Sequence, residues 1–223
     1  MYELAQSVRF FSDFQASDLA FLAEAAGRTL LISVLSVSIG TVLGCVFGWL
    51  LSVSRWAGAV TLGLILDAFR SIPLIIQLIL FFNFFPIIGF PVNPFAAGTF
   101  VLVFYTSALV ASVARGGIEA VPITTRRAAR SLGMTYWQDM RYIVWPIGLR
   151  AVLPAWAGVA LGVLKDSALV SVLGYVELLR ASQILVTRTQ EPLLILTVVG
   201  AFYFALSFPI SRATASLERR WQK

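Results

Sequence analysis

The stretch TLLISVLSVSIGTVLGCVFGWLLSVS, residues 29–54, contains no charged side chain. A second uncharged stretch covers residues 71–114, and only 13% of the chain is charged. In soluble globular domains, roughly a quarter of the residues are charged. A helix of about 20 apolar residues is needed to cross the hydrocarbon core of a bilayer. Because nothing in water requires uncharged stretches of this length, the sequence predicts an integral membrane protein.

The membrane-crossing segments are expected to be helices, because a segment in lipid must satisfy its backbone hydrogen bonds internally. The prolines and the asparagine of FPIIGFPVNP, residues 85–94, separate the second expected span from the third. We therefore predict an all-α polytopic membrane protein that forms a single transmembrane domain over residues 1–223. The five expected spans cover residues 30–54, 62–85, 96–114, 151–173 and 192–211.

The first 25 residues mix charged and aromatic side chains, which predicts an amphipathic helix on the membrane surface. They lack the basic start and the cleavage site of a signal peptide. The excess of Lys and Arg marks cytoplasmic loops and predicts an outside N-terminus and a cytoplasmic C-terminus. Lys165 falls inside a span and is assigned to neither side. The cytoplasmic group is Arg55, Arg70, Arg115, Arg126, Arg127, Arg130, Arg141, Arg150, Arg212, Arg219, Arg220 and Lys223, against Arg9, Arg28, Arg180 and Arg188.

The net charge of +6 is explained by basic loops beside anionic lipid, so membrane lipid is the expected partner and nucleic acid is not. The longest expected loop, residues 115–150, contains RAARSLGMTYWQDMRYIVWP at residues 127–146. Long ordered loops tend to carry function. An ordinary solvated loop with helical content is the alternative interpretation.

Residues 127–146 predict two short helices with an angled joint. Gly133 stands where a helix would end in a left-handed turn. Thr135 and Gln138 have the spacing of a capping box that begins a second helix. The apolar residues follow helical steps of three and four, which predicts that one face contacts something apolar. These residues are Ala129, Leu132, Tyr136, Met140 and Ile143.

The pattern RAA, three residues, Gly, nine residues, Ile, one residue, Trp-Pro resembles the cytoplasmic loop signature of importer permeases of the ATP-binding cassette class. That signature begins Glu-Ala-Ala and ends Leu-Pro. The residues in register are Ala128, Ala129, Gly133, Ile143 and Pro146. Three further motifs are similar to the polar amino-acid branch of the class: FRSIPLIIQL (69–78), RGGIEAVP (115–122) and LKDSALVSVLGYVELLR (164–180). The resemblance runs from about Phe21 to Arg220.

The resemblance implies that the loop carries a coupling helix, which sits in a cleft of a separate ATPase and transmits its closing to the spans. It also implies an ATPase dimer, a second permease chain, an extracellular substrate-binding protein and a bacterial inner-membrane location. The sequence contains no Gly-x-x-x-x-Gly-Lys-Ser/Thr phosphate loop. We therefore expect ATP and Mg to bind the partner ATPase. This chain is expected to bind no cofactor or metal and not to be an enzyme. The expected ATPase-coupling residues are Arg127, Ala128, Ala129, Leu132, Gly133 and Met134.

The sequence departs from the signature at two positions. Arg127 stands where the family has its acidic residue, and Trp145 replaces the leucine before the proline. A heterodimer, in which a second permease keeps the standard loop, would explain Arg127. A partner ATPase with a compensating acid is the other explanation, and we favour the heterodimer.

The substrate path is expected to contain buried polar groups. Lys165 and Asp166 lie inside the fourth span, where a charge costs at least a few kcal/mol. They point about 100° apart on a helix, which weakens the alternative of a self-neutralising pair. A carboxylate at Asp166 could bind the ammonium group of an amino acid. By the resemblance, the Asp of this motif and the following hydroxyl residue, Ser167, lie near the central cavity.

By the resemblance, relatives that carry cationic amino acids have a Glu at the position of Val159, and an acidic residue often stands at the position of Ser112. Their absence here predicts a neutral or acidic polar amino acid, or a derivative, as substrate. Other polar candidates lie on the second and third spans and would otherwise bond between helices. These are Gln77, Asn83, Tyr105, Thr106 and Ser107. The predicted substrate-binding residues are Asp166, Ser167, Gln77, Ser107 and Ser112.

Three local features predict helix geometry and packing. Pro73 is expected to kink the second span. Gly40, Gly44 and Gly48 form a small-residue stripe that permits close helix packing. Cys45 lies alone inside a span, where packing is its expected role.

Three other functions are alternatives to a permease. An enzyme lacks support, because the chain contains no histidine and its carboxylates are scattered. A secondary transporter driven by an ion gradient, with Asp166 as a relay group, is the alternative function; the long loop and the lack of detectable inverted repeats argue against it. A non-transporting scaffold leaves the buried acid unexplained.

Overall fold

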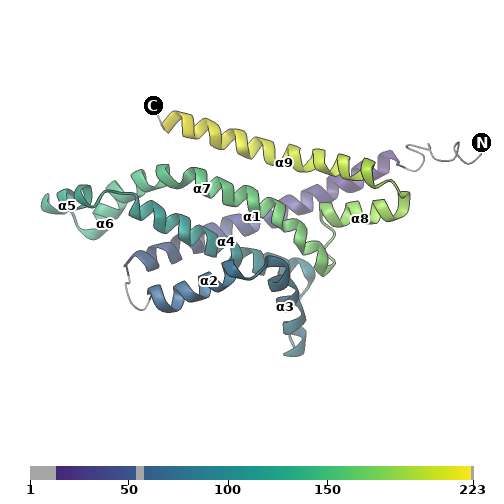
Figure 1. Cartoon of the computed structure of the whole chain (residues 1–223), viewed down its shortest axis with the longest axis horizontal. Helices are drawn as coiled ribbons and strands as arrows, with labels where there is room; N and C mark the ends of the chain where they lie inside the picture. The colour runs from purple at the N-terminus through teal and green to yellow at the C-terminus, as the bar shows by residue number, and fades with distance from the viewer. Residues whose placement is uncertain (1–13, 54–57, 222–223) are drawn as a thin grey trace, which may run out of the picture.

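The computed structural model describes residues 14–53 and 58–221, and in this part of the chain every regular element is helical. The helices form an elongated bundle, from one end of which α5 and α6 project (Figure 1). The α-helices are α1 (Ala16–Val53), α2 (Gly63–Ser71), α3 (Leu74–Ile87), α4 (Pro94–Glu119), α5 (Ile123–Ser131), α6 (Tyr136–Asp139), α7 (Trp145–Asp166), α8 (Leu178–Thr189) and α9 (Pro192–Trp221). Two π-turns, η1 (Gly58–Leu62) and η2 (Met140–Val144), and a 3₁₀ segment, η3 (Ser167–Leu173), complete the order.

Four helical segments in the described part of the chain are long and apolar enough to cross a membrane. They are Ala16–Val53, Pro94–Glu119, Tyr136–Leu173 and Pro192–Arg220. The pair formed by α2 and α3 meets the same criterion together, but it is bent by 105°. The prediction of an all-α membrane protein with about five spans is confirmed.

The bend between α2 and α3 occurs at Pro73, which confirms the predicted kink. Proline has no N–H and disfavours helical geometry at the preceding residue, and Ile72 is accordingly extended with ψ 130°. The break frees backbone carbonyls, which are costly to leave unpaired in a membrane. The Gln77 side-chain amide donates to two of them, Phe69 O and Ile72 O, both at 2.7 Å. The second span is therefore a broken helix joined by a side chain.

The first helix is longer than the sequence suggested. Residues 16–25, expected to belong to a separate surface helix, instead form the first turns of α1, and residues 1–13 lie outside the described part of the chain. The stretch from Ala16 to Arg28 is rich in alanine and leucine and contains no proline, so nothing interrupts the helix. At 38 residues, α1 is about 57 Å long and extends well beyond a bilayer core.

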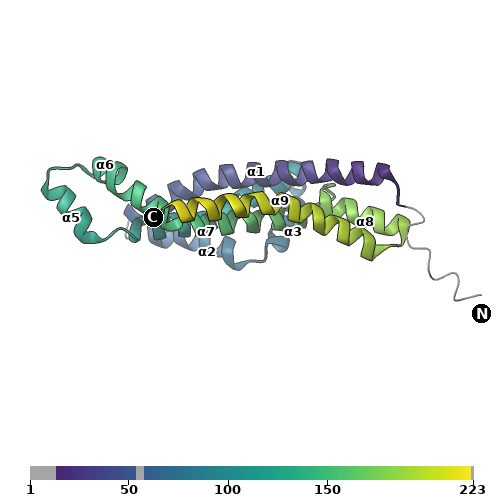
Figure 2. The ribbon, with the colours of Figure 1, turned by 90° about the horizontal axis from the view of Figure 1, so that it is seen from above.

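The chain between the last two expected spans also differs from the expectation. The fourth span is the α-helix α7 followed by tighter 3₁₀ turns in η3, and its helical structure begins before residue 151. A further helix, α8, then occupies Leu178–Thr189, where no element was predicted. It packs on α1 and α9 at the end of the bundle opposite α5 and α6 (Figure 2). Its buried residues recur at helical steps of three and four, but the helix has only 12 residues, too few to form a span, and was therefore overlooked.

The contact between α1 and α4 depends on the predicted glycine stripe. A Cβ built on Gly40 would stand 2.6 Å from the Cβ of Thr106, and one on Gly44 would stand 2.6 Å from the Cβ of Val110. A Cβ on Gly48 would meet the backbone of α4 at 2.7 Å. Side chains at these positions would force the two backbones apart, so the close-packing role of the stripe is confirmed.

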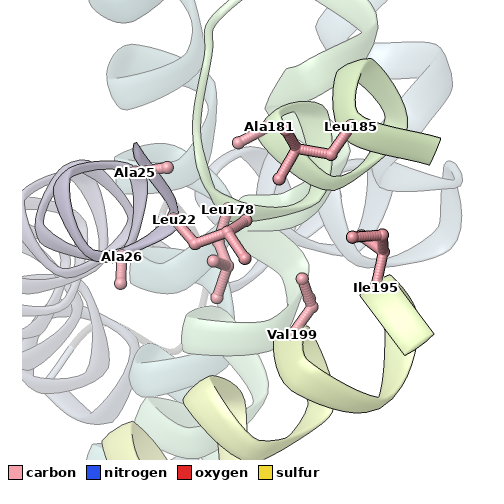
Figure 3. Close-up of a cluster of buried hydrophobic side chains, with 8 residues drawn as sticks. All are labelled: Leu22, Ala25, Ala26, Leu178, Ala181, Leu185, Ile195 and Val199. Carbon is pink, nitrogen blue, oxygen red and sulfur yellow. The ribbon is translucent and has the colours of Figure 1, made fainter. Parts of the chain in front are cut away.

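An apolar cluster of buried side chains lies at the end of the bundle that carries α8. Figure 3 shows side chains from three helices, α1, α8 and α9, meeting there. The cluster comprises Leu22, Ala25, Ala26, Leu178, Ala181, Leu185, Ile195 and Val199. This cluster packs the N-terminal part of α1 against α8 and α9.

We predict that Gly44→Ala destabilises the protein, because the added methyl group must displace Val110 or separate α1 from α4. Overpacking of this kind costs about 1–3 kcal/mol. Gly158→Ala is the matched control, since a Cβ on Gly158 meets nothing within 4 Å. Thermal unfolding of the detergent-solubilised protein should show a lower midpoint for the first variant alone. Equal midpoints would contradict the packing argument.

Candidate functional site

The segment from Ile123 to Asp139, here called the elbow, consists of α5, a short joint and α6. At the joint Gly133 has φ +87°, the left-handed conformation that the sequence predicted. The backbone N–H of Gly133 donates to Arg130 O at 2.9 Å, and that of Met134 donates to Ala129 O at 3.2 Å. These bonds satisfy the last carbonyls of α5 while the chain turns, as in a helix end closed by a left-handed glycine.

The predicted capping box at the start of α6 is confirmed. The backbone N–H of Thr135 donates to Gln138 Oε1 at 2.8 Å, and that of Gln138 donates to Thr135 Oγ1 at 3.4 Å. The two reciprocal bonds fix the direction in which α6 leaves the joint.

An ion pair joins the two arms of the elbow. Arg126 on α5 donates from Nε and Nη2 to Asp139 Oδ2 at 3.0 and 2.9 Å. The Asp139 side chain is fully buried. Sequence reasoning missed this pair, although Asp139 lies three residues after Tyr136 and four before Ile143, on the apolar stripe. An acid on an apolar face, with arginines on the preceding helix, was the available signal.

The elbow also contacts α1, to which it is not adjacent in sequence. Trp49 donates from Nε1 to the Tyr136 hydroxyl at 3.0 Å. Its ring also stacks on Trp137, with 5.6 Å between centroids and an interplanar angle of 30°. Sequence reasoning missed Trp49 because a tryptophan near the end of a span is usually read as a membrane-interface residue.

The expected ATPase-coupling residues differ in exposure. Ala129 is buried against the rest of the elbow and Met134 is half-buried. Arg127, Ala128, Leu132 and Gly133 are exposed, and the Leu132 side chain is 86% exposed although its spacing placed it on the inward stripe. The turn at Gly133 rotates Leu132 away from the stripe. An exposed leucine at the tip of a projecting loop leaves apolar surface that a partner can cover.

Among the polar residues of the expected substrate path, Asp166 differs from the two serines in the partners of its side chain. Asp166 ends α7 and is half-buried. Ser167 and Ser107 are both buried, and their hydroxyls donate to Leu164 O and Phe104 O at 2.8 and 2.7 Å. Hydroxyls that bond their own helix in this way have little donor capacity left for a ligand.

The remaining path candidates make other local contacts. Ser112 accepts a hydrogen bond from Arg70, which also pairs with Asp67 on α2. The Asn83 amide donates to Ile79 O at 2.8 Å. Thr106 is buried against Gly40. The described hydrogen bonds join none of the five predicted substrate residues to another: Asp166, Ser167, Gln77, Ser107 and Ser112.

Glu177 is a buried ionisable residue that sequence reasoning did not single out. Its carboxylate caps α8 by accepting from the backbone N–H groups of Leu179 and Arg180, both at 2.8 Å. The Tyr203 hydroxyl donates to it at 3.3 Å, and Thr29 Oγ1 lies 3.4 Å away. Burial raises the pKa of Glu177, while the backbone N–H donors oppose that rise. The signal was an acid immediately before a helical stretch.

Among the described residues, no three His, Cys, Asp or Glu side chains gather in an arrangement that could hold a metal ion.

The binding-protein-dependent transport system inner membrane component family matches residues 40–223. The chain belongs to this family. It is 28% identical over 201 residues to the glutamine transport system permease protein GlnP of Escherichia coli (strain K12), covering 89% of this chain and 92% of GlnP. It is 31% identical over 200 residues to the probable glutamine ABC transporter permease protein GlnM of Bacillus subtilis (strain 168), covering 88% and 91%.

A solved structure described as an amino acid ABC transporter with histidines is similar, with a TM-score of 0.83 and 31% identity over 91% of this chain and 94% of that one. The resemblance to importer permeases is therefore confirmed. The chain is thus the inner membrane component, the permease subunit, of a binding-protein-dependent transport system.

We predict that Gly133→Val lowers the amount of amino acid transported per ATP hydrolysed. A β-branched residue in the left-handed region costs more than the roughly 1–2 kcal/mol of an ordinary residue, so the joint should change shape. Gly133→Asn is the matched control, because asparagine tolerates this backbone and a Cβ here meets nothing within 4 Å. Equal losses in both variants would show that the side chain matters, not the backbone angle.

Proposed function

We propose that this chain lines the path for a polar amino acid, or a derivative, that is neutral or acidic, and that an ATPase moves the path by pressing on the elbow. The elbow carries this proposal. It projects from the bundle, turns at a left-handed glycine and leaves Leu132 exposed. Such a surface suits a cleft on a partner better than it suits water.

The elbow is assigned to the cytoplasmic side, where the ATPase finds ATP and Mg. Its surface carries exposed arginines, as the positive-inside rule requires of a cytoplasmic loop. They are Arg127 and Arg130; two further exposed arginines follow the elbow, Arg141 on η2 and Arg150 on α7. The N-terminus is then outside and the C-terminus inside. The residues that meet the ATPase are Arg127, Ala128, Leu132 and Gly133 on the surface, with Ala129 and Met134 supporting them.

Asp166 is proposed to bind the substrate ammonium. It is half-buried near the end of a span, and no described hydrogen bond occupies its carboxylate. A charge retained at such a position is functional by default. Ser167, Ser107 and Gln77 bond backbone carbonyls and are assigned to shaping the path around it.

The preference for a neutral or acidic substrate is supported by Ser112 and Arg70. The family resemblance implies that an acid often stands at the position of Ser112, but here the serine hydroxyl accepts from the Arg70 guanidinium. Arg70 is partly neutralised by Asp67. The site therefore presents no extra negative charge, and a cationic side chain would lack its counter-charge there.

The second permease of the complex is proposed to be a different chain. Arg127 reverses the charge that the family presents to the ATPase, and two different permease chains would allow one standard loop to remain. The complex then comprises two unlike permeases, an ATPase dimer and an extracellular substrate-binding protein.

The purified complex, reconstituted in vesicles with its binding protein, should take up amino acid only when ATP is supplied. Labelled glutamine, glutamate and arginine are the probes. Uptake should be larger for glutamine or glutamate than for arginine, because the Ser112 position lacks an acid. Preferred uptake of arginine would contradict the substrate assignment. Uptake driven by an ion gradient without ATP would favour the alternative, a secondary transporter with Asp166 as its relay group.

We predict that Asp166→Asn reduces uptake by about tenfold while the complex still assembles, because a hydrogen bond to a charged group contributes about 1.5–3 kcal/mol. Glu119→Gln is the matched acid-to-amide control, since that side chain is exposed and forms only a surface ion pair with Arg115. Uptake per assembled complex is the measurement. Collapsed assembly with normal residual uptake would make Asp166 a structural residue.

A further inference from the structure

We propose that the Arg126–Asp139 ion pair holds α5 and α6 as one rigid lever, so that a push on α5 reaches the spans instead of folding the elbow. The inference rests on the proposed coupling role of the elbow. It assigns a positioning role to two residues outside the expected coupling set.

The first observation is that α5 has little else to hold it. Of its nine residues, only Ala129 has a buried side chain. An alanine offers one methyl group to apolar packing, and a helix of nine residues is marginal on its own. Two weaker side-chain contacts accompany it: Arg130 lies over the Tyr136 ring at 5.7 Å, near the outer limit of a cation–π interaction, and Arg126 Nη2 lies 3.9 Å from Met140 Sδ at the start of η2.

The second observation is the geometry of the pair. Two N–H groups of the Arg126 guanidinium converge on a single oxygen, Asp139 Oδ2, at 3.0 and 2.9 Å. The Arg126 side chain is only 19% exposed and the carboxylate is fully buried. Charge-assisted bonds of this kind fix direction as well as distance, and burial shields them from screening by salt. The pair therefore resists rotation of α5 about the joint at Gly133.

The third observation is where Asp139 stands in the chain. It is the last residue of α6, and Met140 continues directly into η2 and then α7. The same turn of α6 contacts α1 through Tyr136 and Trp49. A displacement of α5 that is carried to Asp139 is thus delivered to the root of α7 and, through the tryptophan, to α1. Without the pair, bending of the backbone at Gly133 would absorb part of that displacement.

The test is a double-mutant cycle on the reconstituted complex, with Arg126→Gln, Asp139→Asn and the double variant. The measurement is the amount transported per ATP hydrolysed, with the amino acid among glutamine, glutamate and arginine that the wild type takes up best. Each single variant should lower this ratio by roughly tenfold, the size of a typical coupling energy. The double variant should be no worse than the worse single variant, since both remove the same bond. Arg150→Gln, an exposed arginine on α7, is the matched control and should keep the wild-type ratio.

An unchanged ratio in the single variants, or losses that multiply in the double variant, would overturn the proposal. Arg126→Lys keeps the cation but cannot place two donors on one oxygen, so it should give an intermediate ratio. If Asp139→Asn fails to assemble, Arg126→Gln and Arg126→Lys carry the test. Failure of all three to assemble would show that the pair only builds the fold. Wild-type uptake without ATP would instead refute the proposed function, and the lever with it.

Discussion

The close approach of α1 to α4 is the constraint on which the rest of the structure depends. In lipid, no hydrophobic force drives one apolar helix against another, so the contact relies on backbones that can come near. Gly40, Gly44 and Gly48 allow this over more than two turns of α1. The helix then serves as an axis along the whole bundle. Near one end Trp49 contacts the elbow, and near the other Thr29 contacts the cap of α8.

Near each end of this axis a buried carboxylate fixes the local fold of the chain. Asp139 is paired with a guanidinium and fixes the two arms of the elbow. Glu177 has no cation among its described partners; two backbone N–H groups and hydroxyls surround it. The difference matters because a buried ion pair is fixed in direction, whereas a capped carboxylate mainly positions the start of one helix. The end on which we propose that the ATPase pushes is thus held by the more directional bond.

The sequence predicted features that depend on neighbouring residues and missed those that depend on distant ones. The spans follow from uncharged length, the bend from Pro73, and the joint from Gly133 with Thr135 and Gln138, all of which act within a few residues. The extent of α1 was missed because the charged residues before Thr29 suggested a surface helix. The pairs Arg126–Asp139 and Trp49–Tyr136 join residues 13 and 87 positions apart. For Ser107 and Ser167, residue type alone could not show that their hydroxyls bond the preceding turn.

The charge of one residue in the loop signature does not show whether the loop contains a stabilising carboxylate, as the elbow illustrates. Because Arg127 replaces the acidic residue of the loop signature, it suggests that the loop lacks an internal carboxylate and that another chain must stabilise its fold. The fold supplies a carboxylate from Asp139 instead, and Arg126, the neighbour of Arg127, binds it. The shape of the elbow is therefore held by this chain itself. What Arg127 changes is an exposed surface of the elbow, and the proposed second, different permease would compensate for that surface rather than for the fold of the loop.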